Sequence, residues 1–120
     1  MKSPSLIKAF GYAGNGIIRF FRYDRNGRIH LLATILVCLA GWYWKISGME
    51  WCAVLLCSAL VTTLEMVNHA LEKLCDIIHP EWHPAIKTIK DVSAGAVLVA
   101  AVVSVVIGLI IFIPKLSFVL

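Results

Sequence analysis

Apolar residues fall into four blocks along this chain, and the first block differs in pattern from the other three. Between residues 5 and 22, large apolar side chains recur every three or four positions, and Lys8, Asn15, Arg19 and Arg22 lie between them. This spacing predicts an amphipathic helix. Its basic side and its aromatic or aliphatic side suit the surface of a membrane.

The three later blocks are apolar almost throughout. They cover about residues 29–44, 51–67 and 92–113, and the last of them contains no charged residue. A helix needs about 20 apolar residues to cross the hydrocarbon layer, so the first of these blocks relies on the aromatic run at residues 42–44 as an interfacial anchor. We therefore predict an all-α membrane protein with one interfacial helix and three transmembrane helices.

The composition agrees with a bilayer environment. Of the 120 residues, 60% are hydrophobic and 15% are charged, whereas roughly a quarter of the residues in a soluble domain are charged. The length supports a single domain over residues 1–120. The formal net charge is +4, but the basic residues do not alternate with aromatic ones on one face, so we expect no nucleic-acid partner.

The distribution of Lys and Arg predicts the orientation in the membrane. Six of the eleven Lys and Arg residues precede residue 29, and the positive-inside rule places that end of the chain in the cytoplasm. No clear small-residue cleavage site follows the first apolar run, so we expect this segment to be retained. Alternation of the spans returns the polar segment 68–91 to the cytoplasm, beside the N-terminal segment.

One polar stripe leaves the second apolar block. Glu65, Asn68, Glu72 and Asp76 are spaced by three, four and four residues, which places them on one face of a helix. A carboxylate after a long apolar run is costly in hydrocarbon, and such a group commonly faces the interior of a bundle at a functional site. The alternative is that Glu65 is solvated at the headgroup level and that the later carboxylates form an exposed helix face.

Other interpretations also fit the polar residues. Lys90 and Asp91 are typical of ordinary charges beside a span, and no Gly-rich phosphate-binding motif is present. A non-catalytic membrane subunit would use its charges only for topology and helix pairing, and one charged position in the spans makes no continuous path for transport. The four cysteines lack paired spacing, so we expect neither disulfides nor a cysteine metal site. A zinc site at Cys75, His79 and His83 is disfavoured, because Pro80 would disturb a helix that presents all three.

Two segments resemble the signatures of the prokaryotic diacylglycerol kinase and undecaprenol kinase family. Residues 65–72, Glu-Met-Val-Asn-His-Ala-Leu-Glu, resemble E-x-V-N-x-A-x-E, and residues 90–98 resemble K-D-x-x-A-G-A-V-L. The likeness extends back through residues 10–13 and 25–30. It implies a homotrimeric membrane enzyme that transfers the γ-phosphate of ATP to a lipid hydroxyl with the help of Mg²⁺, at active sites between neighbouring subunits.

The resemblance also implies roles for individual residues. Glu65 matches the catalytic base, and Glu72 matches a metal ligand. The second metal ligand falls at Asp24, where members of the family commonly have Glu, unless Asp24 only pairs with Arg22 or Arg28 at a solvated surface. The residues implied in ATP binding are Tyr12, Asp24, Glu72, Glu81, His83, Lys90 and Asp91, and those implied in binding the lipid are Glu65, Asn68 and Ala94.

The identity of the lipid acceptor is predicted from segments that are less distinctive than the two signatures. Residues 28–30 and 94–97 look more like the undecaprenol kinase branch of the family than like the diacylglycerol kinases. We therefore expect undecaprenol as the acceptor, with diacylglycerol as the alternative. The resemblance implies a multi-pass protein of the prokaryotic cytoplasmic membrane, with its N-terminus in the cytoplasm.

Overall fold

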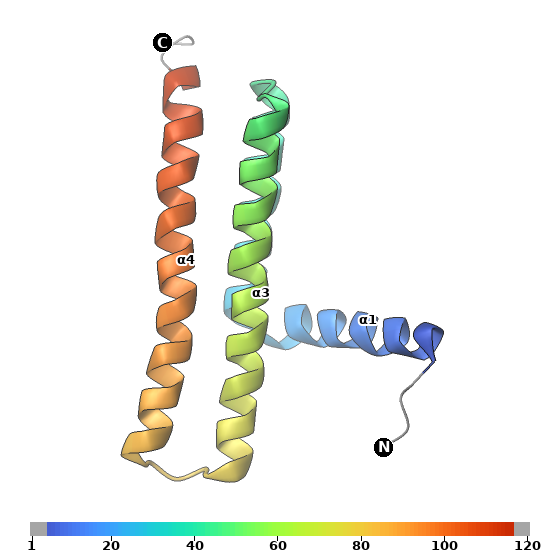
Figure 1. The fold of residues 1–120 in the computed structure, drawn as a ribbon, viewed down its shortest axis with the longest axis vertical. Coiled ribbons are helices and arrows are strands. Elements are labelled where there is room, and N and C mark those ends of the chain that lie inside the picture. The colour runs from blue at the N-terminus through green and yellow to red at the C-terminus, as the bar shows by residue number, and fades with distance from the viewer. Residues whose placement is uncertain (1–4, 117–120) are drawn as a thin grey trace.

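The computed structural model describes residues 5–116, and this part of the chain forms four helices (Figure 1). They are α1 (Leu6–Tyr23), α2 (Arg25–Tyr43), α3 (Gly48–Ile78) and α4 (Pro84–Leu116). The all-α class is therefore confirmed. Residues 1–4 and 117–120 of the expected single domain lie outside the described residues.

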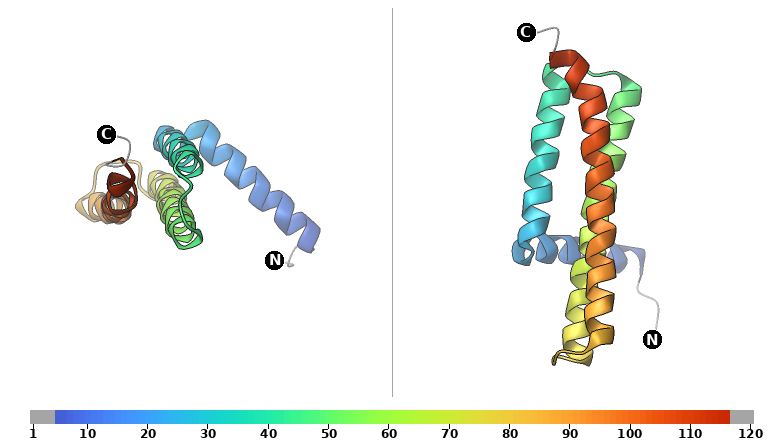
Figure 2. Two further views of the ribbon diagram at one scale, coloured as in Figure 1. Left: turned by 90° about the horizontal axis from the view of Figure 1, so that it is seen from above. Right: turned by 90° about the vertical axis from the view of Figure 1, so that its left-hand side faces the viewer.

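Helix α1 stands apart from the other three. It runs nearly at right angles to the bundle of α2, α3 and α4 (Figures 1 and 2). The Ser5 side chain caps its start by accepting a hydrogen bond from the Lys8 backbone N–H. Apolar side chains such as Leu6, Ile7 and Phe10 are exposed along it, and Phe20 is the buried residue of the helix. This amphipathic helix confirms the element expected at residues 5–22.

A single residue, Asp24, joins α1 to α2. Its extended backbone ends α1, and its side-chain Oδ1 caps the start of α2 by accepting a hydrogen bond of 2.8 Å from the Gly27 N–H. The Phe20 ring packs directly over Gly27, since a Cβ atom at that glycine would lie 2.5 Å from the ring Cζ. The corner between α1 and α2 is thus tightly packed and fixes the position of Asp24.

Helix α3 is the central helix of the bundle and packs against both α2 and α4. A capping box between Ser47 and Glu50 starts it, and the chain leaves it at His79, just before Pro80. Small sets of buried side chains hold the helices together, whereas most large apolar side chains on the outer faces are exposed, as in a protein solvated by lipid. The two buried clusters contain Ile46, Val54 and Ile111, and Val61, Val97 and Ala100.

Two of the helices, α3 and α4, are long and apolar enough to cross a membrane. The 19-residue α2 is not one of the two, so the third span stays a prediction. Helix α3 has 31 residues and α4 has 33, so each is roughly 45–50 Å long at about 1.5 Å per residue, well beyond a hydrocarbon core of about 30 Å. Both helices therefore continue past the expected spans 51–67 and 92–113.

The extra length of α3 and α4 lies mainly at one end of the bundle. Most of the polar segment 68–91 is helical, and the connection between the two helices lies beyond the level of α1 (Figure 1). At the other end, α4 continues through Pro114 to Leu116 instead of ending at the proline. The polar ends of α3 and α4 and the corner at Asp24 thus share one side of the molecule.

Candidate active site

Three of the predicted site residues meet at the corner between α1 and α2. Asp24 comes from the corner itself, and Glu65 and Glu72 come from α3, about two turns apart on the helix. They line one cavity of about 400 Å³. The remaining lining residues are Tyr23, Arg25, Asn26, His69, Lys73 and Asp76. The fold therefore brings together carboxylates from separate parts of the sequence.

Glu65 is buried in the interior of the bundle. It is 3% exposed, and Asn68 is 5% exposed. The alternative of a solvated headgroup position is therefore wrong for Glu65, although Glu72 and Asp76 do lie on an exposed face. Asp24, His30 and Glu72 are close enough to act on the Glu65 carboxylate electrostatically. A buried carboxylate beside two others is an arrangement suited to proton transfer or to cation binding.

Asn68 presents an unsatisfied polar atom at the same level. Its Nδ2 donates a long hydrogen bond of 3.4 Å to Glu72 Oε1, while its buried Oδ1 accepts no hydrogen bond within residues 5–116. Leaving a buried acceptor without a donor costs about 1–3 kcal/mol. A hydroxyl group that enters the site would supply the missing donor.

Asp24 is held by a residue that the sequence did not single out. Its Oδ2 lies 2.9 Å from His69 Nδ1, and its side chain is 9% exposed. The alternative in which Asp24 pairs with Arg22 or Arg28 at a solvated surface is therefore wrong. Arg28 instead donates hydrogen bonds to the backbone carbonyls of Phe21 and Arg22.

A second cavity of about 400 Å³ lies at the connection between α3 and α4. It contains four of the residues implied in ATP binding, namely Glu81, His83, Lys90 and Asp91. Lys90 Nζ pairs with Asp76 Oδ1 at 2.7 Å, and Asp76 also lines the first cavity. Lys87 Nζ pairs with Asp91 Oδ2 at 2.6 Å. The Lys90–Asp76 ion pair, which the sequence did not indicate, therefore connects the two cavities.

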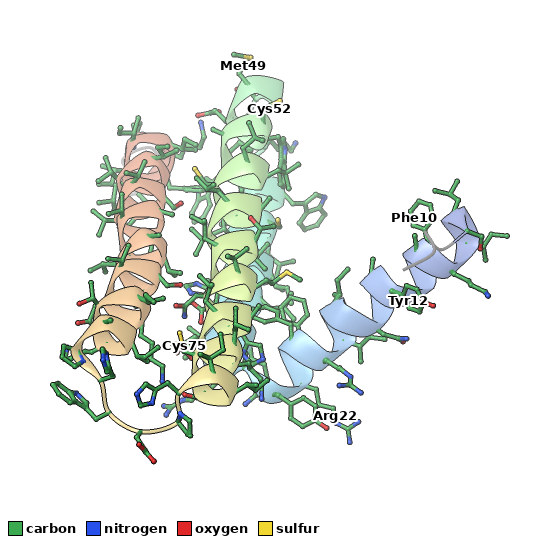
Figure 3. All side chains as sticks on the ribbon, turned by 60° about the horizontal axis from the view of Figure 1, so that its bottom comes forward. Phe10, Tyr12, Arg22, Met49, Cys52 and Cys75 are labelled. Carbon is green, nitrogen blue, oxygen red and sulfur yellow. The ribbon has the colours of Figure 1, made fainter. Side chains whose placement is uncertain are left out.

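Two predicted site residues lie away from these cavities. Tyr12 is 62% exposed and sits well along α1, at a distance from the end of α3 that carries Cys75 (Figure 3). Ala94 is exposed on α4. Neither residue lines either cavity. A single copy of the chain thus does not place Tyr12 or Ala94 beside Glu65.

The carboxylates fit a hard divalent cation. Mg²⁺ prefers oxygen ligands and is commonly bound by one or two carboxylates together with phosphate oxygens and water. Asp24 and Glu72 supply such oxygens. Within residues 5–116 no group of three His, Cys, Asp or Glu side chains is arranged to hold a metal ion on its own. Of the residues considered for zinc, Cys75 is buried, and the His79 and His83 rings pack with centroids 5.2 Å apart.

Comparisons with known proteins identify the family. Residues 11–112 match the sequence model of the family described as prokaryotic diacylglycerol kinase. The undecaprenol kinase of Bacillus subtilis is 41% identical over 110 residues, which cover 92% of this chain and 89% of that protein. A diacylglycerol kinase of Synechocystis sp. is 35% identical over 115 residues, which cover 95% of this chain and 66% of that protein. The diacylglycerol kinase of Escherichia coli K12 is 29% identical over 105 residues, which cover 84% of this chain and 83% of that protein. The chain therefore belongs to the prokaryotic diacylglycerol kinase family.

Proposed function

We propose that this protein is a membrane lipid kinase that transfers the γ-phosphate of ATP to the hydroxyl group of undecaprenol. The observation that carries the proposal is the meeting of Asp24, Glu65 and Glu72 in one cavity at the corner where α1 joins the bundle. Helix α1 is suited to the headgroup region of a bilayer. A lipid hydroxyl in that region lies at the same depth as the cavity.

The residues divide the chemistry between them. Asn68 Oδ1, which accepts no hydrogen bond within residues 5–116, receives the lipid hydroxyl and holds it beside Glu65. Glu65 takes the proton of that hydroxyl as the oxygen attacks the γ-phosphorus, while the bond from this phosphorus to the bridging oxygen breaks and ADP leaves. Phosphoryl transfer depends mainly on positioning and on neutralisation of charge, and Glu65 and Asn68 supply the positioning of the alcohol beside a base.

The nucleotide occupies the polar side of the corner and extends towards the connection between α3 and α4. Asp24 and Glu72 would hold Mg²⁺, and the bound ion would supply neutralisation of the charge on the ATP phosphates. Lys90 turns from Asp76 towards a phosphate oxygen. Glu81, His83 and Asp91 line the second cavity and contact the rest of the nucleotide.

The assembly completes the site. We infer three transmembrane helices, with α2 as the third, a cytoplasmic N-terminus and a homotrimer in the prokaryotic cytoplasmic membrane. The exposed apolar faces of α2, α3 and α4 support burial against lipid and other copies. Tyr12 and Ala94, which lie away from the cavities of their own chain, contact the nucleotide and the lipid of a neighbouring copy.

Purified protein in lipid micelles tests the acceptor directly. We expect kcat/KM for phosphate transfer from ATP to be about tenfold higher with undecaprenol than with diacylglycerol. The two acceptors differ in shape, a narrow polyprenyl alcohol and a wider glycerol lipid, so one site does not fit both equally well. The similarity to the undecaprenol kinase of Bacillus subtilis favours this order, and the Synechocystis relative favours the alternative. Faster phosphorylation of diacylglycerol would reassign the acceptor, and no phosphorylation of either lipid would contradict a lipid kinase.

Lys90 is the cation expected to contact the ATP phosphates. Replacing Lys90 by Gln should raise the KM for ATP by about tenfold or more, since a hydrogen bond from a charged group to a phosphate contributes about 1.5–3 kcal/mol. Lys115→Gln is the matched control, because Lys115 also lies on α4 and pairs with a carboxylate of α3, Glu50, but at the other end of the bundle. An unchanged KM in the Lys90 variant would remove this residue from the nucleotide site.

A further inference from the structure

We propose that His69 is a positioning residue that fixes the Asp24 carboxylate for cation binding, an inference that rests on the proposed function. His69 belongs to α3 and faces the corner between α1 and α2. Its ring lies between the carboxylate cavity and a larger groove between α1 and α3, and it lines both. The residue has no role in the transfer step described above.

The contact holds one oxygen of Asp24 from the side of α3. His69 Nδ1 lies 2.9 Å from Asp24 Oδ2, and because an ionised carboxylate only accepts hydrogen bonds, Nδ1 carries the hydrogen. The Phe20 ring packs edge-on against the imidazole, with centroids 5.9 Å apart. The His69 ring is thus oriented by packing as well as by its hydrogen bond.

The other oxygen of Asp24 is held from the side of α2. Oδ1 accepts the 2.8 Å hydrogen bond from the Gly27 N–H, so the two anchors together leave the carboxylate little freedom to rotate. Each carboxylate oxygen still has a second acceptor position. Asp24 therefore remains able to bind a cation while its plane is fixed.

A fixed carboxylate matters here because of its charged surroundings. Asp24 acts electrostatically on Glu65, and so does Glu72; the three like charges repel one another before a cation is bound. The short Asp side chain also reaches less far than Glu. The hydrogen bond from His69 offsets part of the repulsion and orients the oxygen, as hydrogen-bond partners behind metal ligands do in other proteins, where their loss costs about 10- to 100-fold in metal affinity or activity.

The same contact ties α1 to α3, so a merely structural role has to be separated from positioning. His69→Ala removes the hydrogen bond, whereas His69→Asn keeps an N–H donor close to the place of Nδ1. Thr63→Ala is the matched control on the same helix, because the Thr63 side chain is exposed and bonds only to backbone carbonyls of its own helix.

The test is the binding of Mn²⁺ to purified protein with a non-hydrolysable ATP analogue, followed by electron paramagnetic resonance, together with the melting temperature. We expect His69→Ala to weaken Mn²⁺ binding by about tenfold, and we expect His69→Asn to restore most of it. Thr63→Ala should bind Mn²⁺ as the wild type does. Wild-type Mn²⁺ affinity in His69→Ala would overturn the proposal. It would also be overturned if both His69 variants lost Mn²⁺ binding in proportion to a fall in their melting temperatures.

This readout separates the inference from the proposed function, because it needs no phosphoryl transfer. Wild-type protein that binds Mn²⁺ in a His69-dependent manner but phosphorylates no lipid would contradict the kinase and support the role of His69. An active lipid kinase whose Mn²⁺ affinity is the same in the wild type and in His69→Ala would support the proposed function and overturn the role of His69.

Discussion

Replacing Glu65 by Gln is expected to lower the turnover of the lipid kinase by about 10²- to 10⁴-fold, the usual contribution of a general base. Gln has nearly the same size and remains polar, so the packing around this 3% exposed side chain is retained. The amide, however, does not take up a proton at the pH of the assay. The measurement is the initial rate of phosphate transfer to undecaprenol at saturating ATP.

A matched substitution on the same helix guards against a general effect on folding. Glu50→Gln changes a carboxylate of α3 at the opposite end of the bundle, where Glu50 forms a capping box with Ser47, and Gln serves equally well in that motif. We expect Glu50→Gln to retain near-normal turnover, and we expect Glu65→Gln to bind ATP with unchanged affinity. Near-normal turnover in the Glu65 variant would remove this residue from the role of base.

The helices could be predicted because their signals are local. Apolar spacing indicated the amphipathic helix near its observed bounds, Leu6–Tyr23. The ends of the helices relative to the membrane were less predictable. The stretch between Asn68 and Cys75 is polar but has good helix-forming residues and no breaker, so hydrophobicity falls well before the helix ends.

The contacts of the site depended on the corner at Asp24. His69 and Asp24 are 45 residues apart, and they meet only because one extended residue turns the chain between α1 and α2. An acidic residue directly before a helix is an N-cap signal, and it could have located this corner, but nothing in the sequence gives the angle between the helices. The Lys90–Asp76 pair likewise depends on how α4 returns along α3.

The positions of Tyr12 and Ala94 relative to the cavity could not be predicted from the sequence pattern. Their roles came only from the resemblance to the family, and in one chain both residues lie away from the carboxylate cavity. The cavity itself was predictable in part, because Glu65, Asn68 and Glu72 share a helix face by spacing alone. Contacts made by a neighbouring copy leave no periodic pattern in a single sequence.

The second large effect is expected at Asp24, where two substitutions separate the charge of the side chain from its capping role. Asp24→Asn should lower turnover by about 10- to 100-fold, because the amide lacks the charge that a cation ligand needs. The fold should be kept, since Asn caps a helix as well as Asp does. Asp24→Glu restores the residue that the family commonly has at this position, and it should retain much of the activity.

Asp24→Glu should have the opposite effect, because its longer side chain keeps the charge but loses the helix cap. Its carboxylate leaves the Gly27 N–H, so we expect a loss of about 1 kcal/mol in stability, as for other lost caps, while the charge remains next to Glu72. The melting temperature and the Mg²⁺-dependent rate of the two variants should therefore change independently. Asp24→Asn should lower the rate with little effect on the melting temperature. Asp24→Glu should lower the melting temperature with a smaller effect on the rate. Wild-type rates in Asp24→Asn would contradict the role of Asp24 as the second metal ligand beside Glu72. Such rates would mean that Asp24 only caps α2 and pairs with His69, because both of these contacts tolerate the loss of the charge.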